Sequence, residues 1–205
     1  MVITYYGGQY FKVSFGNTIL AFNPIAKKTD WPTVKFGAEV AFVSMQHPHF
    51  NGAEQVISRN RQTFVIDGAG EYEVGEVTAT GYGVATNYDK KQRFNTIYKV
   101  NLEGMSMVFL GALDKIEIED EILGAIQGSD ILFIPIDGDD VLSATMASKL
   151  SNKLEAKLII PMSSRSKSIK VFLEEGSQAV KPIDKLTIKK KDVTDMEGQI
   201  AVIKS

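Results

Sequence analysis

The feature of this sequence that most limits its fold is a series of apolar strands that occurs twice in the same order. Residues 11–22 predict a hairpin turning at Gly16-Asn17, and residues 38–44 predict a buried strand that ends in a loop. Residues 96–111 predict two strands around Glu103-Gly104, and residues 129–135 another buried strand and loop. Corresponding pieces lie roughly 90 residues apart, which indicates two related halves, residues 1–90 and 91–205.

Helix signals predict how each half is covered. Residues 143–156 predict a helix with Ser143 as a plausible N-cap, and Leu142, just before it, continues the spacing by four of Met146, Leu150 and Leu154 on one face. Residues 116–128 and 168–176 predict two further helices. Two sheets, each covered on one face by helices, can bury their free faces against each other. We therefore expect an α/β fold, a four-layer αββα sandwich forming one domain over residues 1–205. The tail, residues 186–205, is predicted to form a last hairpin.

Composition excludes several classes of function. The chain has no cysteine, so disulfides, thiolate metal sites and a cysteine nucleophile are excluded. A net charge of −2 gives no field that attracts nucleic acid or an anionic membrane. The first residues show no charged segment followed by an apolar one, and no apolar run approaches the ~20 residues of a membrane helix. We expect a cytoplasmic protein that binds neither nucleic acid nor membrane.

In the predicted sandwich, loops at the strand ends of both halves converge at one edge. These loops are residues 44–51, 111–114, 137–140 and 162–165. The first of them, "VSMQHPHFNG", holds both histidines of the chain, His47 and His49. Any active site is therefore expected at this edge, and the histidine pair raises the possibility of a metal site there.

Seven segments in this order resemble the metallo-β-lactamase fold, in particular the branch similar to L-ascorbate-6-phosphate lactonase. They are "ITYYGGQYFKV", "TILAFNP", "FGAEVAFVSMQHPHFNG", "VIDGAGEYEVGEV", "VFLGALD", "SDILFIPIDGDDVLSATMASKL" and "KLIIPM". The resemblance covers most of the chain and implies the αββα sandwich. It also implies a relationship to binuclear hydrolases, in which an H-x-H-x-D-H loop helps bind two cations that activate a bridging water.

Most of the ligand positions implied by this resemblance carry other residues here. With Asn51-Gly52 as the anchor, the motif falls on Met45, His47, His49 and Phe50 in that order, so only His47 keeps its type. The bridging aspartate position is Ala112, a further histidine position is Ser163, and the early "DP" is Asn23-Pro24. A thioether is too soft a donor for Zn²⁺ or Mn²⁺, and a phenyl ring or a methyl group offers none. The resemblance therefore implies a degenerate site that has lost both metals.

Three alternatives remain open. His47 and His49 could bind a single Zn or Mn ion with a third donor from Asp67, Glu71, Asp114 or Asp137, although Pro48 predicts that the two imidazoles point to opposite sides. Asp67 and Glu71 could form a metal-free acid–base pair. Separately, Ser163, Ser164 and Arg165 could bind an anion such as phosphate.

We conclude from the sequence that no cofactor is expected and that the protein is a pseudoenzyme, a non-catalytic binding or assembly module. Self-association into a homo-oligomer is implied by the resemblance. The alternative function is an atypical metal-dependent hydrolase of a phosphorylated sugar lactone or a phosphoester.

Overall fold

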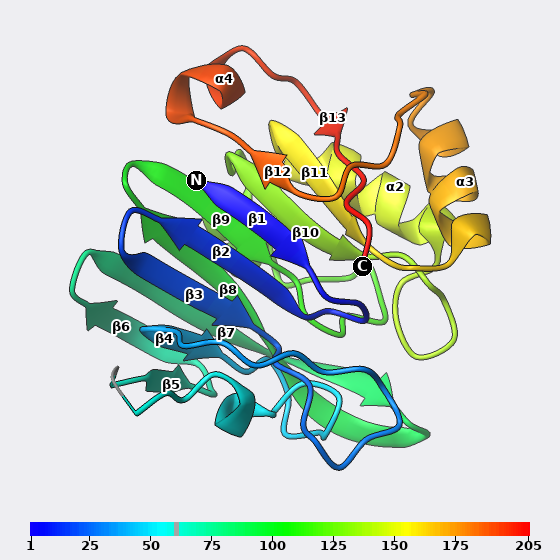
Figure 1. The fold of residues 1–205 in the computed structure, drawn as a ribbon. Helices are drawn as coiled ribbons and strands as arrows, with labels where there is room; N and C mark the ends of the chain where they lie inside the picture. Colours follow the sequence, from blue (N-terminus) through cyan, green and yellow to red (C-terminus); the bar gives the residue numbers. More distant parts are fainter. Residues whose placement is uncertain (60–61) are drawn as a thin grey trace.

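The chain folds into two β-sheets that pack face to face (Figure 1). The computed structural model describes residues 1–59 and 62–205. The first sheet has the strand order β12-β1-β2-β3-β4-β5, and the second has the order β13-β11-β10-β9-β8-β7-β6. Both sheets are mixed, since each contains parallel and antiparallel pairs. The predicted sandwich is therefore confirmed.

The strands of the first sheet are β1 (Val2–Tyr5), β2 (Phe11–Phe15), β3 (Thr18–Phe22), β4 (Val40–Phe42), β5 (Phe64–Ile66) and β12 (Leu186–Thr187). Those of the second sheet are β6 (Gly70–Val74), β7 (Val77–Tyr88), β8 (Lys91–Leu102), β9 (Met105–Phe109), β10 (Ile131–Pro135), β11 (Leu158–Met162) and β13 (Gln199–Ile200). The hairpins predicted at Gly16-Asn17 and Glu103-Gly104 are present as β2–β3 and β8–β9.

The main core lies between the sheets, where apolar side chains from alternate strand positions meet. Phenylalanine rings contribute from both sides: Phe11 packs edge-on to Phe133 at 5.0 Å, and Phe22 stacks on Phe109 at 5.0 Å. All four rings are fully buried. Such aromatic pairs add to the stabilisation from burial, and their preferred geometry favours one arrangement of the two sheets.

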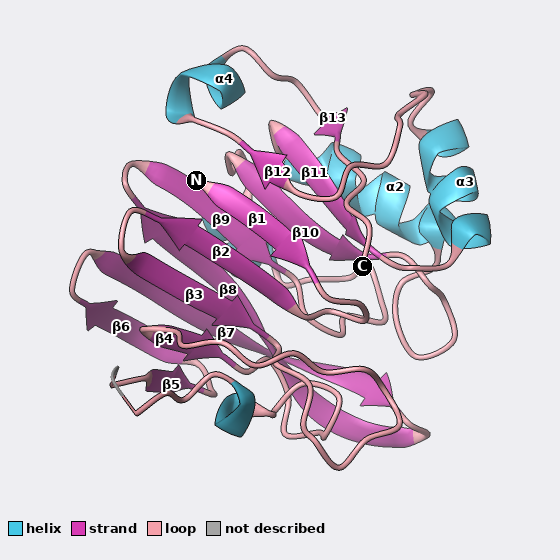
Figure 2. Cartoon of the chain, viewed as in Figure 1, coloured by secondary structure: helices cyan, strands magenta, loops and turns pink. Residues whose placement is uncertain are grey.

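Helices cover the outer face of the second sheet: α1 (Asp120–Ile126), α2 (Ala144–Leu154) and α3 (Ser166–Glu175), of which α2 and α3 are seen clearly in Figure 2. The Ser143 side chain accepts a hydrogen bond from the Met146 N–H, which confirms it as the N-cap of α2. The first sheet is covered differently. Its outer face packs against the irregular segment 23–39, which brings Trp31 and Phe36, and against a single 3₁₀ turn at Ala53–Gln55.

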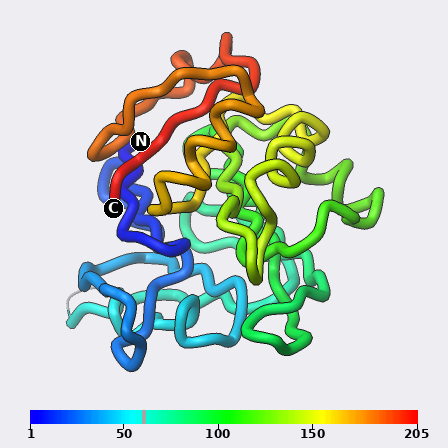
Figure 3. The backbone as a smooth tube through the Cα atoms, turned by 90° about the vertical axis from the view of Figure 1, so that its right-hand side faces the viewer, coloured from blue at the N-terminus to red at the C-terminus, as the bar shows by residue number. Residues whose placement is uncertain are grey.

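Two sequence expectations are corrected by the topology. The sheets divide between β5 and β6, because β6 and β7 pair with the second sheet; residue 90 lies in the turn of the β7–β8 hairpin. The tail is not a hairpin. β12 pairs with β1 in the first sheet, β13 pairs with β11 in the second, and the helix α4 (Lys190–Thr194) lies between them. Figure 3 shows this C-terminal segment running beside the N-terminal strands. Local alternation identified the strands but could not assign their partners.

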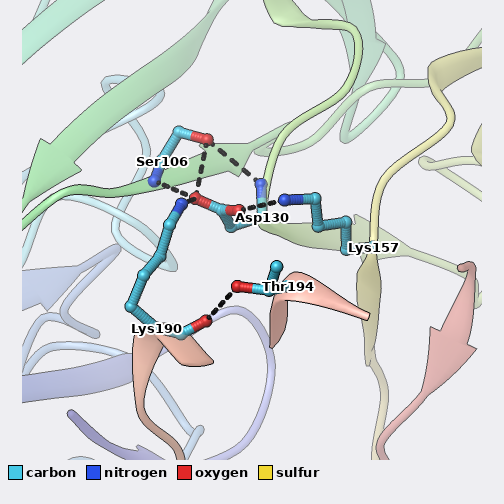
Figure 4. Close-up of polar contacts among 5 residues, drawn as sticks. All are labelled: Ser106, Asp130, Lys157, Lys190 and Thr194. Carbon is cyan, nitrogen blue, oxygen red and sulfur yellow. Dashed lines mark hydrogen bonds and ion pairs between the residues drawn. The ribbon is translucent and has the colours of Figure 1, made fainter. Parts of the chain in front are cut away.

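A buried carboxylate fastens this tail to the second sheet (Figure 4). Asp130, just before β10, accepts hydrogen bonds from Lys157 at 3.0 Å, from Lys190 of α4 at 2.6 Å and from the Ser106 N–H at 2.9 Å. Burial raises the pKa of Asp130, but the bonds from Lys190, Ser106 and Lys157 outweigh burial and lower it. Asp130 is therefore ionised at neutral pH, and its charge is paired.

Within residues 1–59 and 62–205, every helix is too short or too polar to cross a bilayer.

Candidate functional site

The four loops expected to converge do meet at one edge of the sandwich, beyond the carboxyl ends of β4, β9, β10 and β11. Residues of three of these loops, 44–51, 137–140 and 162–165, line a cavity of about 190 Å³, whereas none of residues 111–114 does. Its lining is Gly8, Gln9, Trp31, His49, Phe50, Tyr88, Pro135, Asp137, Gly138, Asp139, Asp140, Val141, Met162 and Arg165. The Leu142 N–H bonds to the Leu113 carbonyl at 2.8 Å, which ties the second loop to the third.

Three of the five positions at which the resemblance implies metal ligands of another type form an apolar cluster beside this cavity. Met45, Phe50 and Ala112 are buried and pack together with Tyr88, and Val141 packs against them. The rings of Phe50 and Tyr88 meet edge to face at 5.0 Å. Three side chains from two loops, at positions where the resemblance implies metal ligands, thus pack together through carbon and sulfur atoms. We call this group of four buried residues the apolar plug.

Buried amides fix the loops that carry the plug. Asn23 accepts a hydrogen bond from the Ser44 N–H at 2.8 Å and donates to the Ser44 hydroxyl at 2.8 Å, which holds the start of the first loop. Asn95 accepts from the Ala112 N–H at 2.8 Å. Gly111 adopts a φ of +61°, and a Cβ there would lie 2.3 Å from the Asn95 oxygen, so this close approach requires glycine.

The two histidines lie side by side on a tight turn, not on opposite sides as Pro48 predicted. Their ring centres are 4.6 Å apart, because the N–H groups of Phe50 and Asn51 both bond to the His47 carbonyl and close the turn. The His47 Nδ1 accepts from the His49 backbone N–H at 3.2 Å. The His49 Nδ1 shares a hydrogen bond of 2.8 Å with the Tyr88 hydroxyl. One nitrogen of each imidazole is therefore already engaged.

Burial lowers the pKa of both histidines. For His47, the neighbouring His49 and Arg93 lower the pKa further, while Asp89 and Asp140 oppose the shift. For His49, the opposing carboxylates are Asp30, Asp89 and Asp140. Both rings are thus neutral at pH 7, and the His47 Nε2 lies 4.0 Å from the Asp89 carboxylate.

Two aromatic residues of the site were missed by the sequence argument. Tyr88 ends β7 and belongs to the plug, and Trp31 stacks on His49 at 3.9 Å between ring centres, with an angle of 10° between the planes. A Cβ at Gly8 would lie 2.5 Å from the Trp31 ring, so the indole is held between Gly8 and His49. Trp31 is the only tryptophan of the chain, which was the one sequence signal that could have drawn attention to it. Tyr88 lies next to the predicted boundary between the halves at residue 90, and nothing in the sequence marked it as a site residue.

The residues present do not fit a catalytic metal ion, which needs three protein donors. Of the proposed third donors, Asp114 accepts two hydrogen bonds from Asn87, and Asp137 accepts one from Ser163. Asp67 accepts from Gln46, and Glu71 is exposed on the edge strand β6. In the part of the chain that the structure describes, no three His, Asp or Glu side chains are grouped closely enough to hold a metal ion.

The remaining two candidate sites are placed as follows. Asp67 lines a second cavity with Arg93 and Phe94, of about 490 Å³, and Glu71 is not among the residues around it. The Ser163 hydroxyl, buried, donates to Asp137, and Arg165 pairs with Asp139 at 3.0 Å, whereas Ser164 is exposed. An anion would have to displace these carboxylates, so the geometry favours neither the acid–base pair nor the anion site, and both stay predictions.

Comparison with solved structures shows the same fold in several hydrolases. A proposed Zn-dependent hydrolase of the metallo-beta-lactamase superfamily from Thermotoga maritima superimposes with a TM-score of 0.79 at 24% identity, covering 99% of this chain and 98% of that one. A proposed metal-dependent hydrolase from Parabacteroides distasonis gives 0.68 at 11% identity, with 98% and 91% covered. The metallo hydrolase Igni18 from Ignicoccus hospitalis gives 0.63 at 15% identity, with 92% and 99% covered.

These identities support the fold and not an activity. A search of curated proteins found no match. The family model of the beta-lactamase superfamily domain matches residues 2–163, a range that includes His47, His49, Ala112 and Ser163. With the sandwich and the loop arrangement described above, this match shows that the chain belongs to the beta-lactamase superfamily.

Proposed function

We propose that this protein is a non-catalytic, metal-free member of the superfamily that acts as a binding module, with its ligand site at the loop edge. The apolar plug is the single observation that carries the proposal. Where the family pattern calls for imidazole and carboxylate ligands, Met45, Phe50 and Ala112 are buried against Tyr88. This cluster offers only a thioether sulfur and a phenol hydroxyl that is already bonded to His49, and these cannot replace the hydration shell of a divalent cation.

The cavity beside the plug supports a binding role. Although several ligand positions carry other residues, side chains do not fill the whole loop edge, since a cavity of about 190 Å³ remains there. Its walls combine aromatic rings with amide and charged groups, the mixture typical of small-molecule sites. We propose a cytoplasmic location for this module as well, based on the expectations from the sequence.

Elemental analysis tests the metal-free proposal. The full chain is purified without a histidine tag or chelator, and Zn, Mn, Fe and Ni are measured per chain. We expect well under one ion per chain, because residues 1–59 and 62–205 bring no further His, Asp or Glu ligands together with the two imidazoles. Near-stoichiometric metal that disappears in the His47→Ala, His49→Ala double variant would overturn the proposal and favour the atypical hydrolase.

A rebuilt variant provides the matched control. Met45→His, His49→Asp, Phe50→His, Ala112→Asp and Ser163→His together restore the ligand pattern of the family at the positions found here. If loss of ligands explains the metal-free state, the rebuilt chain binds zinc in the same assay while the original chain does not. A screen of esters, lactones and phosphoesters tests the non-catalytic claim, and turnover by the original chain that resists chelation would contradict it.

A further inference from the structure

The cavity at the loop edge has a charge that suits a cation. Asp137, Asp139 and Asp140 line it, and the one opposing charge in the lining is Arg165. Arg165 is committed to Asp139, with 3.0 Å between the guanidinium and the carboxylate, and both lie exposed at the rim. Two carboxylates, those of Asp137 and Asp140, are left to set the charge of the interior.

Asp140 is the less satisfied of these two carboxylates. Asp137 accepts a hydrogen bond from Ser163. Asp140 is half-buried, and among the residues that the structure describes no side chain donates a hydrogen bond to it or forms an ion pair with it. Burial is the main cause that raises the pKa of Tyr88, and the charge of Asp140 adds to it; the same charge opposes the lowering of the pKa of His49 by burial. A half-buried carboxylate of this kind gains most from a cationic partner.

A second, independent feature is the amide of Gln9 in the cavity wall, of which only the oxygen is paired. The Ser44 N–H bonds to Asn23 Oδ1 and fixes the orientation of that amide. Asn23 Nδ2 then donates to Gln9 Oε1 at 3.0 Å, which leaves Gln9 Nε2 on the other side. Gln9 is only 5% exposed and lines the cavity, yet its Nε2 has no acceptor in the described part of the chain. The Nε2 atom is not sealed from solvent, so it reaches the open space of the cavity, where it can donate a hydrogen bond to a ligand oxygen.

The aromatic part of the lining completes the description. Trp31, Phe50 and Tyr88 contribute ring edges or faces to the same cavity as Asp140. Aromatic rings combined with carboxylates are the usual environment of an organic ammonium group. A bare metal ion is disfavoured, because these carboxylates are not grouped closely enough to coordinate one within the described residues.

We propose that the cavity binds a small organic cation, an ammonium compound that also carries a hydroxyl or carbonyl oxygen, with the cation near Asp140 and Asp137 and the oxygen on Gln9 Nε2. This inference rests on the proposed function, since it assumes that the edge is a ligand site and not a metal centre. It reverses the charge preference expected of a site for phosphorylated substrates.

The test uses Trp31 as its reporter. This residue is the only tryptophan and lines the cavity, so the intrinsic fluorescence of the full chain reports on this site alone. The probe is choline, and the matched control is its uncharged carbon isostere, dimethylbutanol, which has the same shape and hydroxyl. We expect saturable fluorescence changes with choline and at least about tenfold weaker binding of the isostere.

Variants locate the interaction. Asp140→Asn, which keeps the shape and removes the charge, should weaken choline binding by about tenfold, and Gln9→Leu by about fivefold through loss of the oxygen contact. Asp195→Asn, beside a different cavity, removes the same charge elsewhere and should leave binding unchanged. Circular dichroism of each variant verifies that it is folded.

Three results would overturn the inference: no saturable response to choline, equal binding of the isostere, or equal binding by Asp140→Asn. None of them bears on whether the chain is metal-free, which elemental analysis decides separately. Conversely, stoichiometric metal in the purified chain would refute the proposed function even if choline bound.

Discussion

The regions at the two ends of strand β10 differ in whether they contain a buried charge. At its start, Asp130 is buried but ionised, and two lysines and a backbone N–H satisfy it. Beyond its other end lies the apolar plug, in which Phe50 and Ala112 are almost completely inaccessible to water. Of these two regions, only the one with lysines and a backbone N–H beside the carboxylate contains a buried carboxylate. This is expected from the high free energy of burying an unpaired charge.

This contrast explains why loss of metal ligands would not be a single event. The bridging aspartate and the imidazoles of a binuclear site are stabilised by the cations they bind. Without the cations, each remaining carboxylate would be an uncompensated charge in a dry environment. Ala112 at the aspartate position carries no charge, Met45 and Phe50 at imidazole positions carry no ring nitrogen, and the three side chains pack directly together.

The largest loss of stability is expected when a charge is placed in the apolar plug. Ala112→Asp should lower the free energy of unfolding by about 4 kcal/mol, because the new carboxylate faces Met45 and Phe50 without a partner. Urea unfolding followed by circular dichroism measures the change. Ala112→Asn, of equal size and uncharged, is the control and should lose clearly less. Equal losses would mean that volume, not charge, is what the plug excludes.

Removing the largest ring of the plug tests whether it contributes as core. Phe50→Ala should destabilise the protein by about 3–4 kcal/mol, since the ring is buried and the loops around it are held by hydrogen bonds that resist collapse. Phe94→Ala is the control: this ring is 81% exposed and its loss should change stability by less than about 0.5 kcal/mol. A small effect at Phe50 would indicate a loose loop and weaken the argument for the plug.

At the opposite end of β10, Asp130→Ala should lower the free energy of unfolding by about 3 kcal/mol. The loss leaves the Ser106 N–H unpaired and releases α4, although Lys157 and Lys190 can turn toward water. Asp184→Ala, which removes an exposed ion pair with Lys204, should cost less than about 1 kcal/mol. A change below about 1 kcal/mol at Asp130 would show that the lysines do not compensate its burial.

The smallest expected effect is on the pH dependence of stability. The pKa of His47 and His49 is lowered in the folded state, so the unfolded chain binds more protons once the pH falls below about 6.5. The histidines therefore leave stability intact above that pH and reduce it below. Urea unfolding at about pH 7.5 and about pH 5.5 should show a larger fall for the original chain than for His47→Gln, His49→Gln. If the original chain and the variant lose the same stability between the two pH values, protonation of the two imidazoles does not oppose folding.

Much of the fold followed from local sequence patterns, and much of the site did not. Alternation and turn residues located the hairpins at Gly16-Asn17 and Glu103-Gly104, because these signals act within a few residues. The order of loops predicted which segments meet at the edge. The hydrogen bond between Tyr88 and His49 and the stacking of Trp31 on the His49 ring could not be predicted. Both join residues far apart in the sequence, and Trp31 lies in an irregular segment.

The pairing of β12 with β1 has a consequence for biosynthesis. The amino group of Met1 bonds to the Ile188 carbonyl at 2.9 Å, and β1 is flanked by β12 on one side and β2 on the other. β1 is synthesised long before β12, so the sheet that contains it lacks this border strand until residues 186–187 have left the ribosome. During translation that open border is free to pair with other chains, so nascent copies would depend on rapid completion or on a chaperone to keep them apart.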